Sequence, residues 1–481
     1  MSISLQNEPQ LFQEAEAHYG SGRMAEARAV CERLIAAAPH HHDALNLLGI
    51  IAAQDGDNAR AVDFIARAAA LSDDNPDFHS NLGVVLERVQ QYYGAAASYH
   101  RALTLRPDDA VTWFNRGNVL RELGQRREAL ECYERALTLQ PDFISAEERC
   151  FWLHVSETRD IARIMQLAGK ISAHRAKEDA DKTRGLKTTA DFRLLHDYEQ
   201  AAYLLNHNQA LPGLHEAHMH AKAALDRQTV APAGNLIFMT DAEAAAVATL
   251  REQALLYPAP ALAHSALNPG NDWPAVEAQY FSGNLELVVI DNLLSPEALE
   301  SLRSFALTST IWRREYANQY LGAFSEGGFV SPLHLQIADE LREKMPRIFG
   351  DHRLEHLWAF KYASSQTGKG INVHADFARV NLNFWITPDD ANLDPQSGGL
   401  IVYDVPSPTS WNFQEYNNDP AHIYAFLQER GARSETVPYR CNRAVLFNSN
   451  LFHETDAIRF KEGFESSRIN VTYLFGRGLK A

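Results

Sequence analysis

The sequence predicts a multidomain α + β protein, with an all-α repeat solenoid at the N-terminus and a double antiparallel sheet at the C-terminus. Glycine, alanine and proline recur at one fixed spacing through the first third of the 481-residue chain. Short aromatic and β-branched runs, separated by turn residues, fill the C-terminal part. A chain of this length exceeds one ordinary hydrophobic core, so the two patterns are expected to form separate domains.

The N-terminal repeat has a period of 34 residues. Gly49, Gly83 and Gly117 keep this step, and so do two further sets: Ala27, Ala61, Ala95 and Ala129, and Pro39, Pro107 and Pro141, with Asp73 in the remaining proline slot. Small residues let paired helices approach closely, and a proline ends the second helix of each pair. The period and composition resemble the tetratricopeptide repeat, and the predicted repeat domain covers residues 8–142.

Tetratricopeptide arrays usually hold a peptide or a partner protein on their concave face, or mediate self-association. The resemblance therefore implies a peptide or protein substrate bound through this domain, and it allows a homodimer. The first helices of successive repeats carry candidate residues for that face, with ordinary solvation as an equally weighted alternative: Asn46, Asn81, Asn115 and Arg116. Fold alone does not decide between these uses.

Composition excludes several classes of protein. The formal net charge of -16 disfavours a nucleic-acid partner, because phosphate contact needs clustered Lys and Arg. The N-terminal residues lack a signal-peptide pattern, and no apolar run approaches the length of a membrane span. The four cysteines are scattered without a C-x-x-C pair, which fits a reducing compartment. A cytoplasmic protein without a membrane partner is expected.

The rest of the chain changes from helical to strand-like patterning. Residues 143–262 keep helix-spaced apolar residues and are expected to form a helical extension or linker. A proline-rich, irregular stretch then leads into Leu285–Asn292, which is typical of a buried strand. Ser295 is expected to cap a helix that has Pro296 in its first turn. The later runs, "HLWAFKYA", "VNLNFWIT", "GGLIVYD", "RAVLFNS" and "INVTYLFG", predict a jelly-roll-like double sheet over residues 275–481.

Three residues of this domain have the chemistry of a metal site. His374 and Asp376 form an H-x-D motif, and His453 follows the hydrophobic run "NRAVLFNSNLF". In an extended segment, residues i and i+2 point to the same side, so both side chains can reach one ion. Two neutral imidazoles and a carboxylate take one face of a non-haem Fe(II) and leave positions open. These residues are the predicted metal ligands and catalytic centre. The same set also binds Zn²⁺, and coincidental placement is the bland alternative.

The order of these motifs, followed by "SSRINVTYLF", resembles the Fe(II)/2-oxoglutarate-dependent dioxygenases over roughly residues 280–478. The resemblance implies a double-stranded β-helix (jelly-roll) domain, Fe(II) on the three ligands above, and 2-oxoglutarate and O2 as cosubstrates. It also implies a basic residue on a late strand for the distal carboxylate of 2-oxoglutarate. Arg468 matches, because a planar guanidinium suits a bidentate carboxylate contact. Arg459 is the alternative, in a segment with the pattern of a loop.

Further residues are expected around the cosubstrate. Members of the family often place a tyrosine or an asparagine near it. Tyr362, on the run before the H-x-D motif, and Asn470, two residues past Arg468, match this pattern. Thr472 continues on the same side of the last run, since alternate residues of a strand share a face.

Two segments are expected to contact the substrate. Trp312–Pro332 is rich in Tyr, Phe and Gly and predicts a mobile lid or substrate loop, with Arg314, Tyr316 and Tyr320 as contacts and loop packing as the alternative. Along "RVNLNFWIT", alternation places four residues on one side, which is expected to face the cavity because buried polar groups need partners: Arg379, Asn381, Asn383 and Trp385.

The resemblance implies hydroxylation of an unactivated C–H bond, with 2-oxoglutarate converted to succinate and CO2. Related halogenases have a small residue in place of the carboxylate ligand, so Asp376 favours hydroxylation, with desaturation left open. A repeat arm before an oxygenase domain is similar in layout to aspartyl/asparaginyl β-hydroxylases and prolyl 3-hydroxylases, which favours a peptide or protein side chain. One alternative is a small-molecule tailoring hydroxylase whose repeats mediate dimerisation or bind a partner, and another is a scaffold with an inactive ligand-binding domain. A third is a nucleic-acid dealkylase, which is disfavoured because Leu474 stands where those enzymes have their second arginine.

Overall fold

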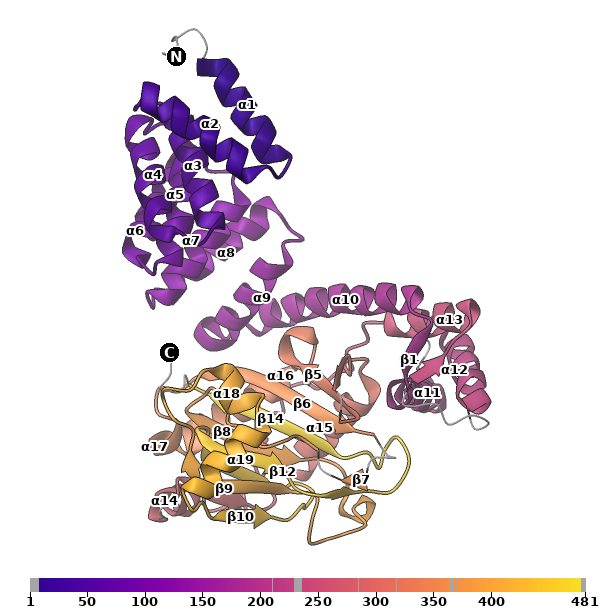
Figure 1. The fold of residues 1–481 in the computed structure, drawn as a ribbon. Helices are drawn as coiled ribbons and strands as arrows, with labels where there is room; N and C mark the ends of the chain where they lie inside the picture. The colour runs from indigo at the N-terminus through magenta and orange to yellow at the C-terminus, as the bar shows by residue number, and fades with distance from the viewer. Residues whose placement is uncertain are drawn as a thin grey trace. The chain divides into compact units, whose positions relative to one another are not determined.

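A computed structural model describes residues 8–476 of the chain, except residues 210, 229–235, 284, 317, 364–366 and 369. The chain divides into two compact units, Met1–Glu157 and Thr158–Ala481. Figure 1 shows helical hairpins in the first unit and sheets with flanking helices in the second. Among the described residues, no helix is both long enough and apolar enough to cross a bilayer.

The N-terminal unit is a succession of paired helices in which each repeat supplies two. Small residues in the first helix of a pair face large residues in the second: Gly49 meets Ile65, Gly83 meets Tyr99, and Gly117 meets Tyr133. The 34-residue spacing of the glycines thus places the same close helix contact in successive repeats. The helices are α1 (Glu8–Gly20), α2 (Met24–Ala37), α3 (His42–Gln54), α4 (Asn58–Leu71), α5 (Pro76–Arg88), α6 (Tyr92–Leu105), α7 (Ala110–Glu122), α8 (Arg126–Leu139) and α9 (Ile144–Leu153), followed by the π-helical turn η2 (His154–Thr158).

Gly83→Ala is expected to destabilise the repeat unit by about 1–2 kcal/mol. A Cβ at this position would lie 2.5 Å from Cε1 of the buried Tyr99 ring, and the overpacking outweighs the better helix propensity of alanine. Thermal unfolding followed by far-UV circular dichroism measures the change. Gly20→Ala is the control, because a Cβ there meets nothing within 4 Å. An unchanged unfolding temperature for Gly83→Ala would contradict the proposed helix contact.

The second unit begins with helices that pack on the β domain. They are α10 (Ile161–Gly185), α11 (Asp191–Asn206), α12 (Leu214–Gln228) and α13 (Asp241–Arg251), with a small two-stranded sheet of β1 (Thr188–Ala190) and β2 (Leu236–Phe238). Arg193 of α11 donates to the backbone carbonyls of Trp312 and Arg313, at 3.0 and 3.1 Å. Gln200 donates to the carbonyl of Ser309 at 3.0 Å. The helical segment after Thr158 therefore belongs to the same compact unit as the sheets.

Two antiparallel sheets form the core of the β domain. The larger has the order β3 (Leu287–Ile290), β11 (Ala444–Asn448), β8 (Val380–Trp385), β14 (Ile469–Phe475), β6 (Leu354–Tyr362), β5 (Tyr320–Phe324) and β4 (Arg314–Tyr316). The smaller has the order β10 (Ser434–Val437), β9 (Leu400–Pro406) and β12 (Leu451–Thr455), and β7 (Thr367–Gly368) pairs with β13 (Ile458–Arg459). Trp385 and Phe447 of the larger sheet share one apolar cluster with Val402 and Val437 of the smaller.

Helices flank these sheets (Figure 1): α14 (Trp273–Ser282), α15 (Pro296–Thr308), α16 (Pro332–Lys344), α17 (Pro346–Phe349), α18 (Phe413–Asn417) and α19 (Pro420–Glu429), with short 3-10 turns at Ser325–Gly327 and Asp389–Ala391. The predicted cap of α15 is confirmed, since the Ser295 hydroxyl accepts a hydrogen bond from the Ala298 amide with Pro296 in the first turn. This hydrogen bond gives a partner to one of the backbone amides that have none within the first turn of a helix.

The segment Trp312–Pro332 differs from the expected loop. Tyr316 of β4 pairs with Tyr320 of β5, and β5 continues the larger sheet beside β6. Tyr316 and Tyr320 are paired across the hairpin, and Phe324 lies four residues further along β5, so the three rings share one face of the sheet. The hairpin places Tyr316, Tyr320 and Arg314 on the sheet that carries the site described next.

Candidate metal centre

Three side chains from two separate segments converge at one point. His374 and His453 are direct neighbours across a backbone bridge, with amide-to-carbonyl distances of 3.0 and 2.8 Å in the two directions. Asp376 joins them from the same segment as His374. One potential ligand atom from each of the three lies within 4.8 Å of the other two. Pairing between β12 and the H-x-D segment, which are distant in the sequence, thus builds the triad.

Both histidine rings are oriented by the backbone. Nδ1 of His374 lies 2.8 Å from the carbonyl oxygen of Asn372, and Nδ1 of His453 lies 3.0 Å from that of Leu451. A proton on each Nδ1 leaves Nε2 as a lone-pair donor, and the two Nε2 atoms lie 3.8 and 3.4 Å from the Asp376 carboxylate. This tautomer is the one a metal ligand needs. Burial lowers the pKa of His374 to about 4, so the ring is neutral at pH 7.

A chain of amides fixes the carboxylate. Asn381 donates to Asp376 Oδ2 at 2.7 Å, and Asn383 donates to the Asn381 side-chain oxygen at 2.5 Å. Asn470 and Thr472 then donate to Asn383 Oδ1 at 2.9 and 2.7 Å. Burial alone would raise the pKa of Asp376, but the hydrogen bond with His453 and the electrostatic interaction with His374 lower it overall. The group is a carboxylate at neutral pH, held by neighbours that are themselves partnered.

Arg468 is a buried cation that faces the same cavity. Its side chain is 1% exposed, and it donates to the carbonyls of Gly398 (2.7 Å) and Gly399 (3.2 Å), which leaves Nη1 without a partner among the described residues. Its guanidinium carbon lies 4.9 Å from the Tyr362 ring centre and 5.7 Å from that of Trp385. Burial lowers the pKa of Arg468, and an unpaired buried cation is costly unless an anion joins it.

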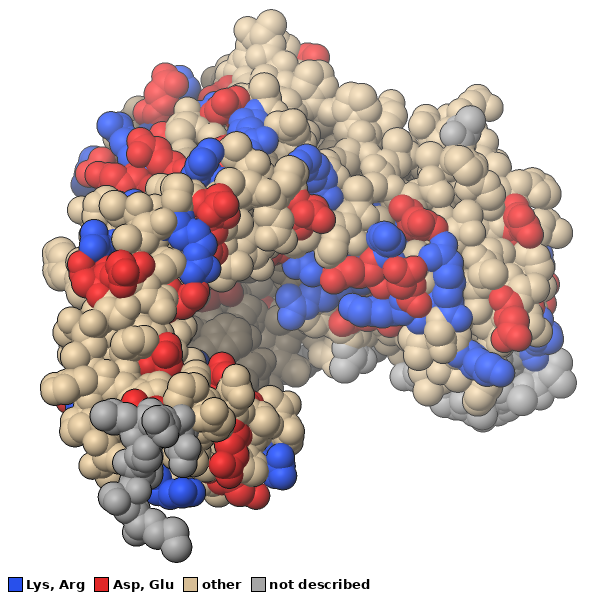
Figure 2. Space-filling model, turned by 90° about the horizontal axis from the view of Figure 1, so that it is seen from above, with Lys and Arg blue, Asp and Glu red and all other residues tan. Residues whose placement is uncertain are grey.

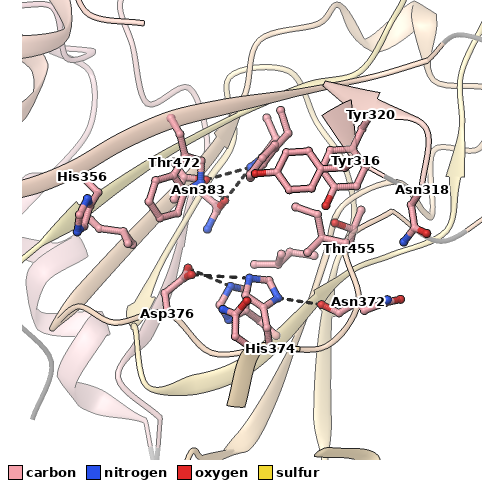
Figure 3. Close-up of a pocket in the computed structure, with 18 of the residues that line it drawn as sticks. Tyr316, Asn318, Tyr320, His356, Asn372, His374, Asp376, Asn383, Thr455 and Thr472 are labelled. Atoms are coloured by element: carbon pink, nitrogen blue, oxygen red, sulfur yellow. Dashed lines mark hydrogen bonds and ion pairs between the residues drawn. The ribbon is translucent and has the colours of Figure 1, made fainter. Parts of the chain in front are cut away.

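The triad and Arg468 line one cavity of about 580 Å³. Figure 3 shows His374 and Asp376 on one side and the rings of Tyr316 and Tyr320 across from them, with Asn383 and Thr472 nearby. The aromatic wall comes from alternate residues of β6, Trp358 and Phe360, and from Phe324 of β5. The remaining lining residues used below are Arg314, Phe377 and Phe413.

The structure places the predicted site residues as follows. The cavity is lined by ten of them: His374, Asp376, His453, Arg468, Asn470, Thr472, Asn383, Arg314, Tyr316 and Tyr320. Tyr362 is buried beneath Arg468, and its hydroxyl lies 3.2 Å from Thr455 Oγ1, while Arg459 is exposed on β13.

Three residues that were expected to face the cavity do not line it: Arg379, Asn381 and Trp385. Arg379 forms a two-pronged ion pair with Glu286 at 2.7 and 3.0 Å and does not line the cavity. It precedes β8, so the alternation of that strand does not govern its direction. Trp385 is 0% exposed and packs under Arg468, so it supports that side chain from below.

Several residues that line the metal-site cavity were not predicted from the sequence. The β6 face of His356, Trp358 and Phe360 was readable from the alternation in "HLWAFKYA", because the intervening Leu357 and Ala359 are buried on the opposite face. The contribution of α18 carried no such signal. It docks on the H-x-D segment itself, with the Ala375 amide donating to the Tyr416 carbonyl at 3.1 Å, and it brings Phe413 and Asn417 to the cavity.

Charge on the visible surface is mixed. Figure 2 shows acidic and basic side chains interspersed, without an extended basic patch among the described residues on that face. Binding to nucleic-acid phosphates requires clustered basic side chains.

The family models that match the chain lie within its N-terminal unit. Models of the tetratricopeptide repeat family match residues 12–76 and 110–143, so the predicted repeat domain is confirmed there. No curated protein matches the chain. A crystal structure of YrrB, "a TPR protein with an unusual peptide-binding site", is 19% identical over 33% of this chain and 82% of its own, with a TM-score of 0.31. A MamA structure from Desulfovibrio magneticus RS-1 is 19% identical over 34% of this chain and 94% of its own, with the same TM-score of 0.31.

Proposed function

We propose that this protein is an Fe(II)- and 2-oxoglutarate-dependent dioxygenase that hydroxylates an unactivated C–H bond. The observation that carries the proposal is one cavity lined both by the His374, Asp376 and His453 triad and by the buried guanidinium of Arg468. Either feature alone has many structural explanations. Together they give one cavity both a candidate set of metal ligands and a buried cation suited to a carboxylate.

The triad fits Fe(II). Two Nε2 atoms and one carboxylate form a facial set of nitrogen and oxygen ligands that leaves the rest of the coordination sphere open. The Asn372 and Leu451 carbonyls and the Asn381 amide supply the outer contacts that orient such ligands. Zn²⁺ would accept the same donors, so metal dependence of turnover decides between the two.

Arg468 fits the distal carboxylate of 2-oxoglutarate. Its unpartnered Nη1 is a free donor in a buried, low-dielectric place, where a charge-assisted hydrogen bond is strong. Tyr362 and Trp385 hold the guanidinium plane from beneath. Asn470 and Thr472 of β14 add polar groups that line the same cavity.

We infer that the two antiparallel sheets form a double-stranded β-helix. The support is the apolar cluster that both sheets share and the position of the triad between the smaller sheet and the segment that enters β8. A jelly roll of this kind keeps its ligands on a rigid frame, which suits a site that must hold three groups in fixed geometry.

When bound, Fe(II), 2-oxoglutarate and O2 would supply the oxidising chemistry, in which 2-oxoglutarate becomes succinate and CO2 and a C–H bond gains a hydroxyl group. The chain's own residues orient both imidazoles through backbone carbonyls, hold the carboxylate through Asn381, and place a buried guanidinium at Arg468. The aromatic wall of Phe324, Trp358 and Phe360 limits water around the reacting groups.

The proposed substrate is a peptide or protein side chain recruited through the tetratricopeptide domain, because such domains generally bind peptides and proteins. A small-molecule tailoring hydroxylase is the second candidate, since a cavity of about 580 Å³ is also within the range of small-molecule sites. Release of succinate from 2-oxoglutarate by the full-length protein, dependent on Fe(II) and removed by a chelator, tests the proposed reaction. Absence of Fe(II)-dependent succinate release would overturn it.

Arg468→Gln is expected to raise the 2-oxoglutarate concentration for half-maximal succinate release by about a hundredfold, because one partner of a buried charge pair is lost. Arg459→Gln is the matched control and is expected to stay near the wild-type value, since Arg459 is exposed outside the cavity. Near-UV circular dichroism checks that the Arg468→Gln site still folds. The opposite ranking of the two variants would assign the anchor to Arg459.

A further inference from the structure

A second cavity adjoins the metal-site cavity within the same compact unit. It has a volume of about 450 Å³ and is lined by α10, by the β4–β5 hairpin and by the turn after β5. Arg314 and Phe324 line both cavities. A ligand that fills both must therefore pass along the hairpin at these two residues.

Several charges of the second cavity have partners within the protein. Arg175 pairs with Glu178 at 2.9 Å, and Asp179 accepts from Arg193 at 3.0 Å. Arg313 donates to the carbonyls of Arg251 and Gln253, both at 2.7 Å. These contacts occupy part of the hydrogen-bonding capacity of Arg175, Asp179 and Arg313.

Arg314, which lines both cavities, has no such partner among the described residues. Its guanidinium carbon lies 5.4 Å from the ring centres of both Tyr316 and Phe324, so two aromatic side chains hold it in place. The described residues offer it no carboxylate within 4.0 Å, and the side chain is exposed. An arginine that is pre-positioned by stacking and lacks an internal partner is suited to bind a carboxylate of a ligand.

The strand that carries Arg314 also has a free edge. β4 is the last strand in the order of the seven-stranded sheet, with β5 as its neighbour on one side among the described strands. An extended polypeptide can pair with the backbone groups of such an edge, whereas a small molecule cannot use the whole row. Exposed aromatic rings at the metal-site cavity, Phe377 (37% exposed) and Phe413 (56% exposed), provide apolar contact for the residue to be oxidised and its neighbours.

We propose that the substrate is an extended acidic polypeptide segment whose target side chain enters the metal-site cavity, whose chain continues along β4 into the second cavity, and whose Asp or Glu carboxylate binds Arg314. This inference rests on the proposed function and narrows its substrate class. The cavity beside the triad must hold both the cosubstrate and the target side chain, so the flanking residues need the room that the second cavity provides.

The test is a selection experiment with full-length protein loaded with Mn(II) and 2-oxoglutarate, since Mn(II) accepts the same nitrogen and oxygen ligands. The probes are two random libraries of blocked nonapeptides, one containing Asp and Glu and the other containing Asn and Gln in their place. Wild type is expected to retain the acidic library about tenfold better. Arg314→Gln should reduce this preference to near parity, and Arg314→Lys should leave an intermediate preference. The repeat domain is unchanged in all variants, so the difference reports on Arg314.

Arg347→Gln is the matched control, because Arg347 is also exposed and stacks on a ring, 5.0 Å from the centre of Phe281, but lines neither cavity. It should keep the tenfold preference. Equal retention of both libraries by wild type, or an undiminished preference in Arg314→Gln, would overturn the inference. So would competition by free indole-3-acetate as strong as that of the acidic peptides, since an extended segment would then add nothing. Succinate release is measured separately. Its absence would refute the proposed reaction, whereas the peptide-retention experiment would still test binding at Arg314.

Discussion

Asp376→Ala is expected to weaken metal binding by at least about a thousandfold and to reduce succinate release below detection. Three protein ligands share a metal-binding free energy on the order of 10 kcal/mol, so the loss of one costs several kcal/mol. The remaining His374 and His453 rings would also lose the carboxylate that lies 3.8 and 3.4 Å from their Nε2 atoms. Calorimetric titration of the metal-free protein with Mn(II) measures the affinity without turnover.

Asn381→Ala should give a smaller loss, about ten- to a hundredfold, because Asn381 acts through its 2.7 Å hydrogen bond to Asp376. Asn381 is a positioning residue, so its variant should bind Mn(II) weakly yet still saturate at one ion per chain. His264→Ala is the control, since His264 is an exposed histidine of the same unit outside the cavity, paired with Glu297. Equal Mn(II) affinity for Asp376→Ala and wild type would show that the triad is not the metal site.

The second large effect is on the free energy of unfolding and concerns a buried ion cluster that contacts the segment leading into β4. Asp197 of α11 lies between two arginines, with Arg251 Nη2 at 2.6 Å and Arg193 Nε at 3.2 Å. All three side chains are buried. Asp197→Ala is expected to cost about 3–5 kcal/mol, because it leaves two buried cations without their shared carboxylate. Arg193 also holds the Trp312 and Arg313 carbonyls, so the start of β4 should loosen with it.

The same ion cluster is expected to make the free energy of unfolding depend on pH. Burial raises the pKa of Asp197, but Arg193 and Arg251 outweigh burial and hold it far below its usual range. The folded state therefore binds fewer protons than the unfolded state at acid pH. The stabilisation is fully present above the unfolded pKa, about 4, and is lost as pH falls toward the folded value. Wild type should lose stability steeply below about pH 4, and Asp197→Ala should lose less.

Urea unfolding followed by tryptophan fluorescence measures both effects, since Trp312 borders the cluster. Asp181→Ala is the matched control on α10. Its ion pair with Arg184 is solvent-exposed, so a change below about 0.5 kcal/mol is expected. If Asp197→Ala were no more destabilising than Asp181→Ala at pH 7, the cluster would not support the fold in the way described.

Patterns that are local in the sequence predicted several features of this structure. The repeat follows from spacing, because Gly83 and Gly117 must each sit where a tyrosine of the partner helix approaches. The H-x-D motif places two side chains on one side of an extended segment whatever surrounds it. The cap of α15 depends on residues within one helical turn. In each case the interacting groups are close along the chain or repeat at a constant period.

Other features depend on contacts between segments that are distant in the chain. Backbone pairing brings His453 beside His374, while Glu286 draws Arg379 away from the cavity that Asn383 faces. The expected loop after Trp312 is a hairpin because β6 offers it an edge to pair with. Spacing and alternation alone determined the repeats, the candidate ligands and the strand faces. Only tertiary pairing decided which polar groups share a cavity, because a side chain's direction is set by the charge or strand edge it meets.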